Sequence, residues 1–529
     1  MVNNGQNYTY DEVPYPYLSH MQTHPDRFAT LGTLLGMKPA DVKQCRVLEI
    51  GCAAGSNLLP MAAVLPDSTF VGIDNSAVQI EQAQADANAI GMSNVTFQYK
   101  DILDINADFG QFDYIIAHGI YSWIPAVVQN KLLDICNHNL APQGIAYVSY
   151  NTYPGWHTLD IIRNMMAYRT RNTTDPYEKS AQARQWISFM AHALKDRPET
   201  AYAAIFENYL SHRMTQTEDL DHLVLLHDEL DINNTPLYFH QFIERAEQHG
   251  LQYLVEADFP TVMPNELSPE VVEHLGKTAR NTIEMEQYFD FMRNRAFRCT
   301  LLCHAEIEVD RRLSIQSLRK FYVGSSAQLV EMDAESDAKG ITTFQGNDGI
   351  QFSTEHALTK AAFHYLLNIA PERVSFDQLV RQAALRLKLT QVTDEDATVL
   401  AANLLGAFSH SMSLIGFFTF TPRMTTVVSE YPLATPLARL QSQQRPYVTN
   451  LLQARVNLDN FSRLVLTKLD GQNDFAALLD FLVELAKDGK ITSLSDEQIA
   501  NTPDEMRASI AKELDITLRM FAVLAVLVA

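Results

Sequence analysis

The chain has 529 residues, of which 47% are hydrophobic and 20% charged, and its net charge is −22. This length is too great for a single hydrophobic core and predicts about two to four domains. The composition is that of an ordinary globular protein, and the negative field repels phosphate backbones, which argues against nucleic acid as a partner.

The ends of the chain do not have the features of membrane segments. Residues 1–17 lack the basic region and apolar core of a signal peptide. The apolar run 521–529 falls short of the ~20 residues that cross a bilayer. We therefore expect a cytoplasmic protein without membrane insertion. Residues 8–17 are rich in tyrosine and proline, and we expect them to be non-helical and to form a lid over a cofactor pocket or to pack on a sheet.

Five scattered cysteines argue against a disulfide framework, because one of them would stay unpaired. Cys299, Cys303 and His304 are close in sequence, but they supply one ligand too few for a structural zinc site. We expect buried thiols and no metal.

Residues 46–57, with the sequence RVLEIGCAAGSN, combine an apolar strand, a glycine turn and the start of a helix. This order is typical of a nucleotide-binding crossover, in which helix amides approach the ligand. A side chain at either glycine of the turn would hold the ligand away from the backbone. The candidate cofactor contacts in this segment are Glu49, Gly51, Ala53, Gly55 and Asn57.

The turn departs from the dinucleotide fingerprint, which has three glycines. Ala53 and Ser56 stand where the later two glycines would be. S-adenosylmethionine (AdoMet) has a ribose and an adenine but no pyrophosphate, so it does not require the third glycine. The pattern therefore favours a methyl donor over NAD.

Strands and helices then alternate, which predicts a parallel, doubly wound sheet. Ligands bind such sheets at the carboxyl ends of the strands. The predicted strands are 46–51, 69–74, 94–99, 112–117 and 145–150, and the predicted helices are 23–35, 56–65, 77–90 and 125–140.

Polar residues follow these strands. Asp74 lies about 20 residues past the glycine turn, where an acid holds a ribose diol. Asp101 would accept from the adenine amino group, and the Ile102 amide would donate to a ring nitrogen. Asn75 and His118 complete the predicted cofactor contacts.

The candidate acceptor-side residues are Tyr121, Trp123, Tyr150 and His157. Methyl transfer to an amine is a direct displacement, so positioning and desolvation dominate. A lysine amine, with a free pKa of about 10.4, would lose its proton more readily in a dry aromatic channel. The aromatic residues line such a channel or pack in the core, and His157 acts as a base or orients a loop.

Beyond residue 160 we expect a helical insertion, 160–226, over the acceptor side of the sheet, with helices 163–171, 177–194 and 198–215. A helix that starts at Pro236, capped by Asn234 or Thr235, precedes the sixth strand, 251–256. The seventh strand is 297–303, after a helix at 284–294. The catalytic sheet then closes near residue 304.

The remainder reads as two winged-helix-like modules. Helices 354–368, 376–386 and 394–410 precede a two-stranded ribbon in 414–421, and a similar order recurs at 445–491 before a long helix, 504–527. A basic recognition helix is lacking, which favours protein contacts over DNA. Residues 432–446 are the predicted linker.

The predicted fold class is α/β: a Rossmann-like, seven-stranded methyltransferase sheet with a helical insertion, followed by α+β winged-helix-like domains. The predicted boundaries are 1–159, 160–226, 227–310, 311–431 and 432–529.

Six stretches carry a resemblance to a known family: 47–57, 149–157 (SYNTYPGWH), 227–230, 238–242, 250–254 and 294–302. They resemble class I methyltransferases with a methyltransferase regulatory domain, and within these the rickettsial protein-lysine methyltransferases that modify an outer-membrane protein. The resemblance implies AdoMet as cofactor, a protein substrate and a chain that can form a homodimer. It makes Gly51, Gly55, Asp74, Asp101 and Ile102 cofactor contacts, while Ser56 stands where relatives often have glycine.

The resulting hypothesis is an AdoMet-dependent methyltransferase that acts on a protein amine, with lysine favoured. One alternative is methylation of a small metabolite or a peptide natural product. Another is a non-catalytic AdoMet-binding sensor or adaptor.

Overall fold

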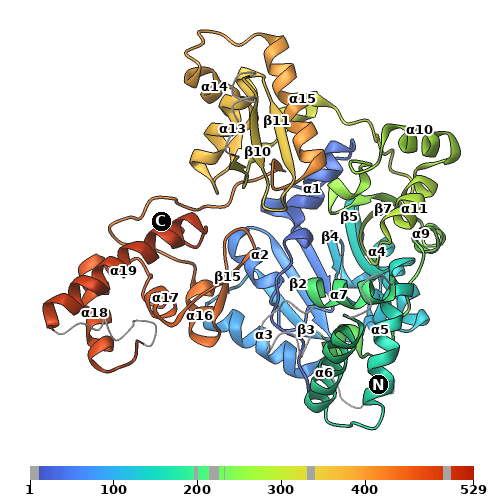
Figure 1. Ribbon diagram of the computed structural model, residues 1–529, viewed down its shortest axis with the longest axis horizontal. Coiled ribbons are helices and arrows are strands. Elements are labelled where there is room, and N and C mark those ends of the chain that lie inside the picture. The colour runs from blue at the N-terminus through green and yellow to red at the C-terminus, as the bar shows by residue number, and fades with distance from the viewer. Residues whose placement is uncertain (1–10, 196–200, 214–224, 232, 331–339, 492–501) are drawn as a thin grey trace.

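The computed structural model describes residues 11–195, 201–213, 225–231, 233–330, 340–491 and 502–529 (Figure 1). No helix within these ranges is long and apolar enough to span a bilayer. The five cysteines are free; Cys299 is half-buried and the other four are buried.

A seven-stranded sheet forms the centre of the molecule, in the order β3-β2-β1-β4-β5-β7-β6. The first five strands are parallel neighbours, whereas β7 runs antiparallel to both β5 and β6. This arrangement confirms the predicted sheet and its closure after residue 300. The strands are β1 (Arg46–Ile50), β2 (Thr69–Asp74), β3 (Val95–Tyr99), β4 (Phe112–Ala117), β5 (Leu140–Asn151), β6 (Leu251–Glu256) and β7 (Phe297–His304).

Helices cover both faces of this sheet (Figure 1). One core contains Phe28 of α1 and Ile80 of α3, and the other contains Leu132 of α4 and Phe242 of α9. Ser76 caps α3 as predicted, by accepting from the amide of Gln79 at 3.3 Å. The helices are α1 (Pro25–Leu34), α2 (Leu58–Val64), α3 (Ala77–Ala89), α4 (Ala126–His138), α9 (Phe239–Gln248), α10 (Pro269–Thr278) and α11 (Thr282–Arg293).

The helix predicted to start at Pro236 begins instead at Phe239, with Tyr238 as its N-cap. Leu237 is held in an extended conformation because it forms a parallel bridge with Thr152, and its amide donates to the Asn151 carbonyl at 3.2 Å. This pairing extends the edge of β5 and delays the helix.

The helical insertion contains α5 (Gly155–Thr170), α6 (Pro176–Leu194) and α7 (Ala201–Arg213), followed by a π-helix, Leu225–Glu229. Part of the third predicted helix, 198–215, lies outside the described residues. The insertion has its own small core, in which Val13 from the N-terminal segment packs with Ile162, Ile187 and Phe206.

The middle unit contains two small sheets, β11-β10-β9 and β12-β8-β13. The predicted ribbon within 414–421 is wrong: β13 pairs with β8, about ninety residues earlier, and not with a neighbouring strand. The elements are β8 (Tyr322–Gly324), β9 (Gln328–Leu329), β10 (Thr342–Gln345), β11 (Gln351–Thr354), α13 (Ala357–Ile369), β12 (Val374–Ser375), α14 (Phe376–Arg386), α15 (Asp394–His410) and β13 (Gly416–Phe418).

The C-terminal unit begins within the predicted linker. Residues 432–446 contain a helix, α16, because Thr435 caps it and Pro436 fits its first turn. The last helix ends at Val523, and Leu527 then pairs with Ala434. The elements are α16 (Pro436–Gln444), β14 (Tyr447–Thr449), β15 (Arg455–Asn457), α17 (Asn460–Leu466), α18 (Phe475–Lys487) and α19 (Pro503–Val523).

Both C-terminal units pack against the catalytic sheet's helices (Figure 1). Asp26 of α1 reaches the middle unit, where it accepts from the Thr419 amide at 2.6 Å and pairs with Arg373 at 3.4 Å. The C-terminal unit contacts α2 through α16. The helices α1 and α2 are therefore each in contact with a unit from the far end of the chain.

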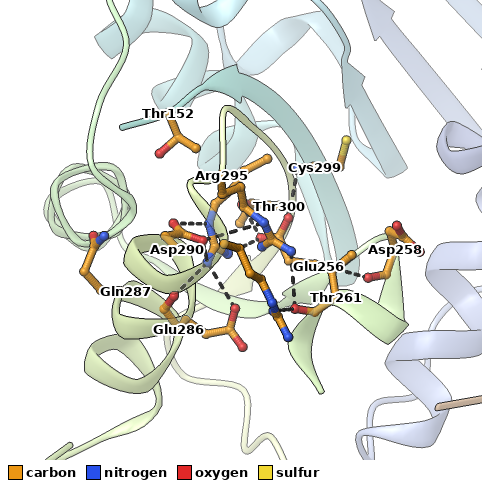
Figure 2. Close-up of polar contacts among 12 residues, drawn as sticks. Thr152, Glu256, Asp258, Thr261, Glu286, Gln287, Asp290, Arg295, Cys299 and Thr300 are labelled. Carbon is orange, nitrogen blue, oxygen red and sulfur yellow. Dashed lines mark hydrogen bonds and ion pairs between the residues drawn. The ribbon is translucent and has the colours of Figure 1, made fainter. Parts of the chain in front are cut away.

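A buried ionic cluster joins β6, β7 and α11. Figure 2 shows Glu256, Glu286 and Asp290 turned toward one another beside Arg295. Arg298, which is 1% exposed, is bonded to all three acids, at 2.8 Å from Glu256 and Asp290 and 3.1 Å from Glu286.

Candidate active site

The turn between β1 and α2 has the backbone shape that glycine permits. Gly51 and Gly55 have φ of +74° and +72°. A Cβ at Gly51 would lie 2.6 Å from Ile120, and one at Gly55 would lie 2.6 Å from the Phe97 ring. The sequence suggested that these positions are glycine because a ligand approaches the backbone closely, but the structure shows two further reasons. Positive φ and neighbouring protein atoms already require them.

Asp74, at the end of β2, holds this turn. Its Oδ2 accepts from the Ala53 amide and its Oδ1 from the Ser76 amide, both at 2.9 Å. Burial raises the pKa of Asp74, and the backbone hydrogen bonds oppose that rise. Because each carboxylate oxygen has two lone pairs, acceptor capacity remains for a ligand hydroxyl.

Glu49 and Asn57 form a buried polar pair beneath the turn. Glu49 is 3% exposed, and its Oε1 accepts from Asn57 Nδ2 at 2.7 Å. Its Oε2 has no hydrogen-bond partner among the described residues. Burial raises the pKa of Glu49 to about 8, against the lowering effect of Asn57 and with a further rise from Asp74. Since burial disfavours the ionised carboxylate, a cation beside Oε2 would be stabilising, and the site is suited to a positively charged group.

AdoMet binding at pH 7 is expected to release up to one proton from Glu49. With a pKa of about 8, this carboxyl holds its proton in the free protein, and an arriving cation favours the ionised form. Calorimetry in two buffers of different ionisation enthalpy measures the release. Glu49→Gln should abolish it, and equal heats in both buffers for the unaltered chain would contradict the assignment.

The other predicted cofactor contacts gather at the same edge of the sheet. The Lys100 amide donates to the Asp74 carbonyl at 2.9 Å, which keeps the ends of β2 and β3 together. Asp101 is exposed and accepts from the Leu103 amide at 2.9 Å, Ile102 is half-buried, and Asn75 is exposed. Their contacts with a nucleoside stay predictions.

Residues 11–24, here called the strap, cross this edge. Ser76 Oγ donates to Asp11 and Ser56 Oγ to the Leu18 carbonyl, both at 2.6 Å. The His20 amide donates to Asn57 Oδ1 at 3.0 Å. The contacts with the cofactor turn come from Leu18 and His20, just after the predicted lid. Within the lid, Asp11 bonds to Ser76 and Val13 enters the core of the insertion, while residues 8–10 lie outside the described ranges. Ser56, which replaces a glycine, holds the strap.

Two histidines meet where β4 ends. The rings of His20 and His118 have centroids 4.0 Å apart, and Phe297 meets His118 edge-on at 6.2 Å. His118 Nδ1 is 2.8 Å from the Tyr147 hydroxyl. Burial lowers the pKa of His20 to about 4 and that of His118 well below its ordinary value. Both rings are therefore neutral at pH 7.

The sequence does not predict that His20 and Phe297 lie beside His118. For Phe297 it predicts only a place in a strand. His20 lies in a segment without helical or strand periodicity, so no local signal marks its proximity to His118.

Two predicted acceptor-side residues belong to the core instead. Tyr121 and Tyr150 are 0% and 1% exposed, and both pack against Phe242 of α9. The Tyr150 hydroxyl is 3.1 Å from Thr300 Oγ1. Side chains enclosed in this way have no surface with which to line a channel, so this part of the interpretation is wrong.

Trp123 and His157 remain accessible. Trp123 is half-buried and meets the buried Trp156 edge-on at 6.3 Å. His157 is exposed, stacks on Tyr153 at 4.0 Å, and its Nε2 lies 3.2 Å from the Tyr238 hydroxyl. Tyr153, His157, Tyr238 and the half-exposed Phe291 form a contiguous group that we call the aromatic strip.

Three family descriptions match separate parts of the chain. Residues 41–200 match a methyltransferase domain, and residues 221–304 match a predicted methyltransferase regulatory domain. Residues 430–526 match the C-terminal winged helix domain of PKMT. The first two together cover the seven strands and most of the insertion, but α7 falls between the two matched ranges.

Full-length relatives share this architecture. An uncharacterized protein of Rickettsia prowazekii is 33% identical over 512 residues, which are 95% of this chain and 90% of that protein. The structure of PKMT2 from Rickettsia typhi matches with a TM-score of 0.85 at 28% identity, over 98% of this chain and 100% of that one. The same protein in complex with AdoHcy matches with a TM-score of 0.84 at 27% identity over the same shares.

The cofactor is S-adenosyl-L-methionine, and the residues present fit it. The buried Glu49 carboxyl and the half-buried Asp74 carboxylate supply oxygen atoms for the cofactor at the glycine turn. The chain belongs to the family of AdoMet-dependent methyltransferases in which a Rossmann-like catalytic domain is joined to a methyltransferase regulatory domain and a PKMT-type C-terminal winged helix.

Proposed function

We propose that this chain methylates the ε-amine of lysine in a protein substrate. The observation that carries the proposal is the apolar, uncharged surroundings of His118 at the end of β4, where His20 and Phe297 meet it. The similarity to PKMT2 over nearly the whole chain supports the same acceptor.

The proposed chemistry requires an uncharged amine. When bound, the cofactor would supply a methyl group on a sulfonium: an amine lone pair bonds to the methyl carbon as the carbon–sulfur bond breaks, and the neutral thioether leaves. A lysine ammonium has a pKa of about 10.4 in water and must first lose a proton. The His20–His118 pair and Phe297 offer no counter-charge, which disfavours the ammonium.

The aromatic strip suits the approach of a polypeptide. It begins at Tyr153, two residues after β5, whose Asn151 is paired with Phe297. From there it runs over Tyr238 to Phe291 on the outside of α11. Half-exposed aromatic faces attract the lysine cation before it is desolvated. We assign the strip to substrate binding, with Trp123 beside it and His157 as an orienting residue.

The cofactor roles are assigned by position. Asp74 would hold the ribose hydroxyls, with Asn75 beside it, and Glu49 a positively charged part of the cofactor. Asp101 and the Ile102 amide would hold the adenine. Residues 1–159 and 227–310 form the catalytic body in this proposal, with 160–226 as the insertion and 311–431 and 432–529 as accessory units.

Incubation of the purified chain with labelled AdoMet and a whole-cell lysate tests the proposal. We expect the label in the protein fraction, and mass spectrometry of the labelled protein should locate methyl groups on lysine. Asp74→Ala serves as the inactive control. Label in the small-molecule fraction would identify a metabolite or peptide methyltransferase. AdoMet binding without any transfer would identify a sensor.

A further inference from the structure

The C-terminal unit reaches the cofactor turn through one side chain. Gln453 Nε2 donates to Asn57 Oδ1 at 2.7 Å and lies 3.3 Å from the Asn57 carbonyl, across 396 positions of sequence. Gln453 is 3% exposed. A buried amide contact of this length between the two ends of the chain is a specific connection, because the buried Gln453 Nε2 would be left unpaired without it.

The segment that presents Gln453 is itself fixed. Asn450 Oδ1 accepts from the amides of Leu452 and Ala454 at 3.0 and 2.8 Å, and Asn450 Nδ2 donates to the Leu524 carbonyl at 2.8 Å. Gln453 has a φ of +63°, a left-handed conformation. The turn is thus braced on the end of α19, and the amide arrives at Asn57 from a preorganised position.

Asn57 transmits this contact to the cofactor site. The side-chain amide of Asn57 has four partners. Gln453 and the His20 amide donate to Oδ1, while Nδ2 donates to Glu49 at 2.7 Å. Nδ2 also lies 2.9 Å from Thr23 Oγ1. Without the donor from Gln453, Asn57 would hold both Glu49 and the strap less firmly.

The C-terminal unit also contacts the strap directly. The Arg445 guanidinium lies 3.5 Å from the centroid of the Tyr17 ring, and the Tyr447 hydroxyl donates to the Tyr17 carbonyl at 3.1 Å. Ser19 Oγ donates to the Gln453 carbonyl at 3.2 Å. Gln444 Nε2 donates to Asp86 of α3 at 3.1 Å. The strap is therefore held between the C-terminal unit and the turn that it covers.

We propose that the C-terminal winged-helix unit forms part of the AdoMet-binding apparatus, with Gln453 as a positioning residue that acts through Asn57 on Glu49 and the strap. AdoMet affinity then depends on the docking of this unit, and a partner or substrate that displaces the unit would loosen the cofactor. The inference depends on the cofactor site at the glycine turn and is independent of the methyl acceptor.

Gln453→Asn in the full chain is the test. Asparagine adopts the left-handed conformation readily, but it is one methylene too short to reach Asn57. We expect AdoMet to bind about 10-fold more weakly in calorimetry, as loss of a buried hydrogen bond predicts. The matched control is Gln472→Asn, an exposed glutamine of the same unit, which should leave the affinity unchanged.

Two further measurements separate positioning from general loosening of the fold. Gln453→Glu has the same length but lacks the donor, so it should weaken AdoMet binding similarly. Adding Gln453→Asn to Asn57→Ala should change the affinity little, because the first acts through the second. Hydrogen exchange at the His20 amide should increase in Gln453→Asn. AdoMet affinities within 2-fold of the unaltered chain for both Gln453 variants, with binding lost in Asp74→Ala, would overturn the inference.

Discussion

Asp74→Ala is expected to weaken AdoMet binding by at least about 30-fold in calorimetry, equivalent to about 2 kcal/mol. The change removes a half-buried carboxylate that would accept from the ribose, and hydrogen bonds to charged groups contribute about 1.5–3 kcal/mol each. It also removes the acceptor for the Ala53 and Ser76 amides. Because Ala53 is held at a φ of +46°, the turn should relax once that bond is lost.

Asp67→Ala is the matched control for this experiment. Asp67 is an exposed acid just before β2, at the opposite end of the strand from Asp74. The control should bind AdoMet as tightly as the unaltered chain. Equal affinity in the Asp74 variant would remove the cofactor assignment, and with it the roles given to Glu49 and Asp101.

The features that the sequence predicts well are those with local signals. The strand–turn–helix at 46–57 and the alternation up to residue 150 follow from apolar runs separated by glycine and capping residues. Ser76 is an example, since it caps the helix that follows it by hydrogen bonding three residues ahead. Strand ends at one edge of a parallel sheet converge, which brought Asp74 and Asp101 onto adjacent strands.

The features that could not be predicted depend on contacts distant in sequence. An aromatic residue after a strand can line a pocket or enter the core. Tyr121 and Tyr150 enter the core because they pack against Phe242, on a helix about a hundred residues later. His20 meets His118 only because the strap lies against the end of β4. No local sequence pattern marks Gln453 as a residue that contacts the cofactor turn. Composition alone suggested a linker at 432–446, where a capped helix forms.

The ionic cluster around Arg298 helps to hold β6 and β7 in the sheet. Three buried carboxylates surround Arg298, and Arg295 lies 3.6 Å from Asp290. Burial acts to raise the pKa of Glu256, but attraction to Arg298 and Arg295 and hydrogen bonds outweigh it, so that pKa is lowered. For Glu286 and Asp290 burial prevails and raises the pKa. The guanidinium therefore holds together groups that would otherwise repel one another.

Arg298→Met is accordingly expected to destabilise the catalytic body by about 3–5 kcal/mol, because it leaves buried carboxylates without their counter-charge. Methionine retains most of the side-chain volume and the contact with Phe239, whose ring centroid lies 3.8 Å from the guanidinium carbon. Urea unfolding followed by circular dichroism measures the change. Arg312→Met is the control, since Arg312 pairs with Asp310 on the surface and an exposed ion pair contributes about 0–1 kcal/mol. Equal unfolding midpoints for the two variants would show that the cluster contributes no more than a surface pair, and that apolar packing alone holds β6 and β7 in the sheet.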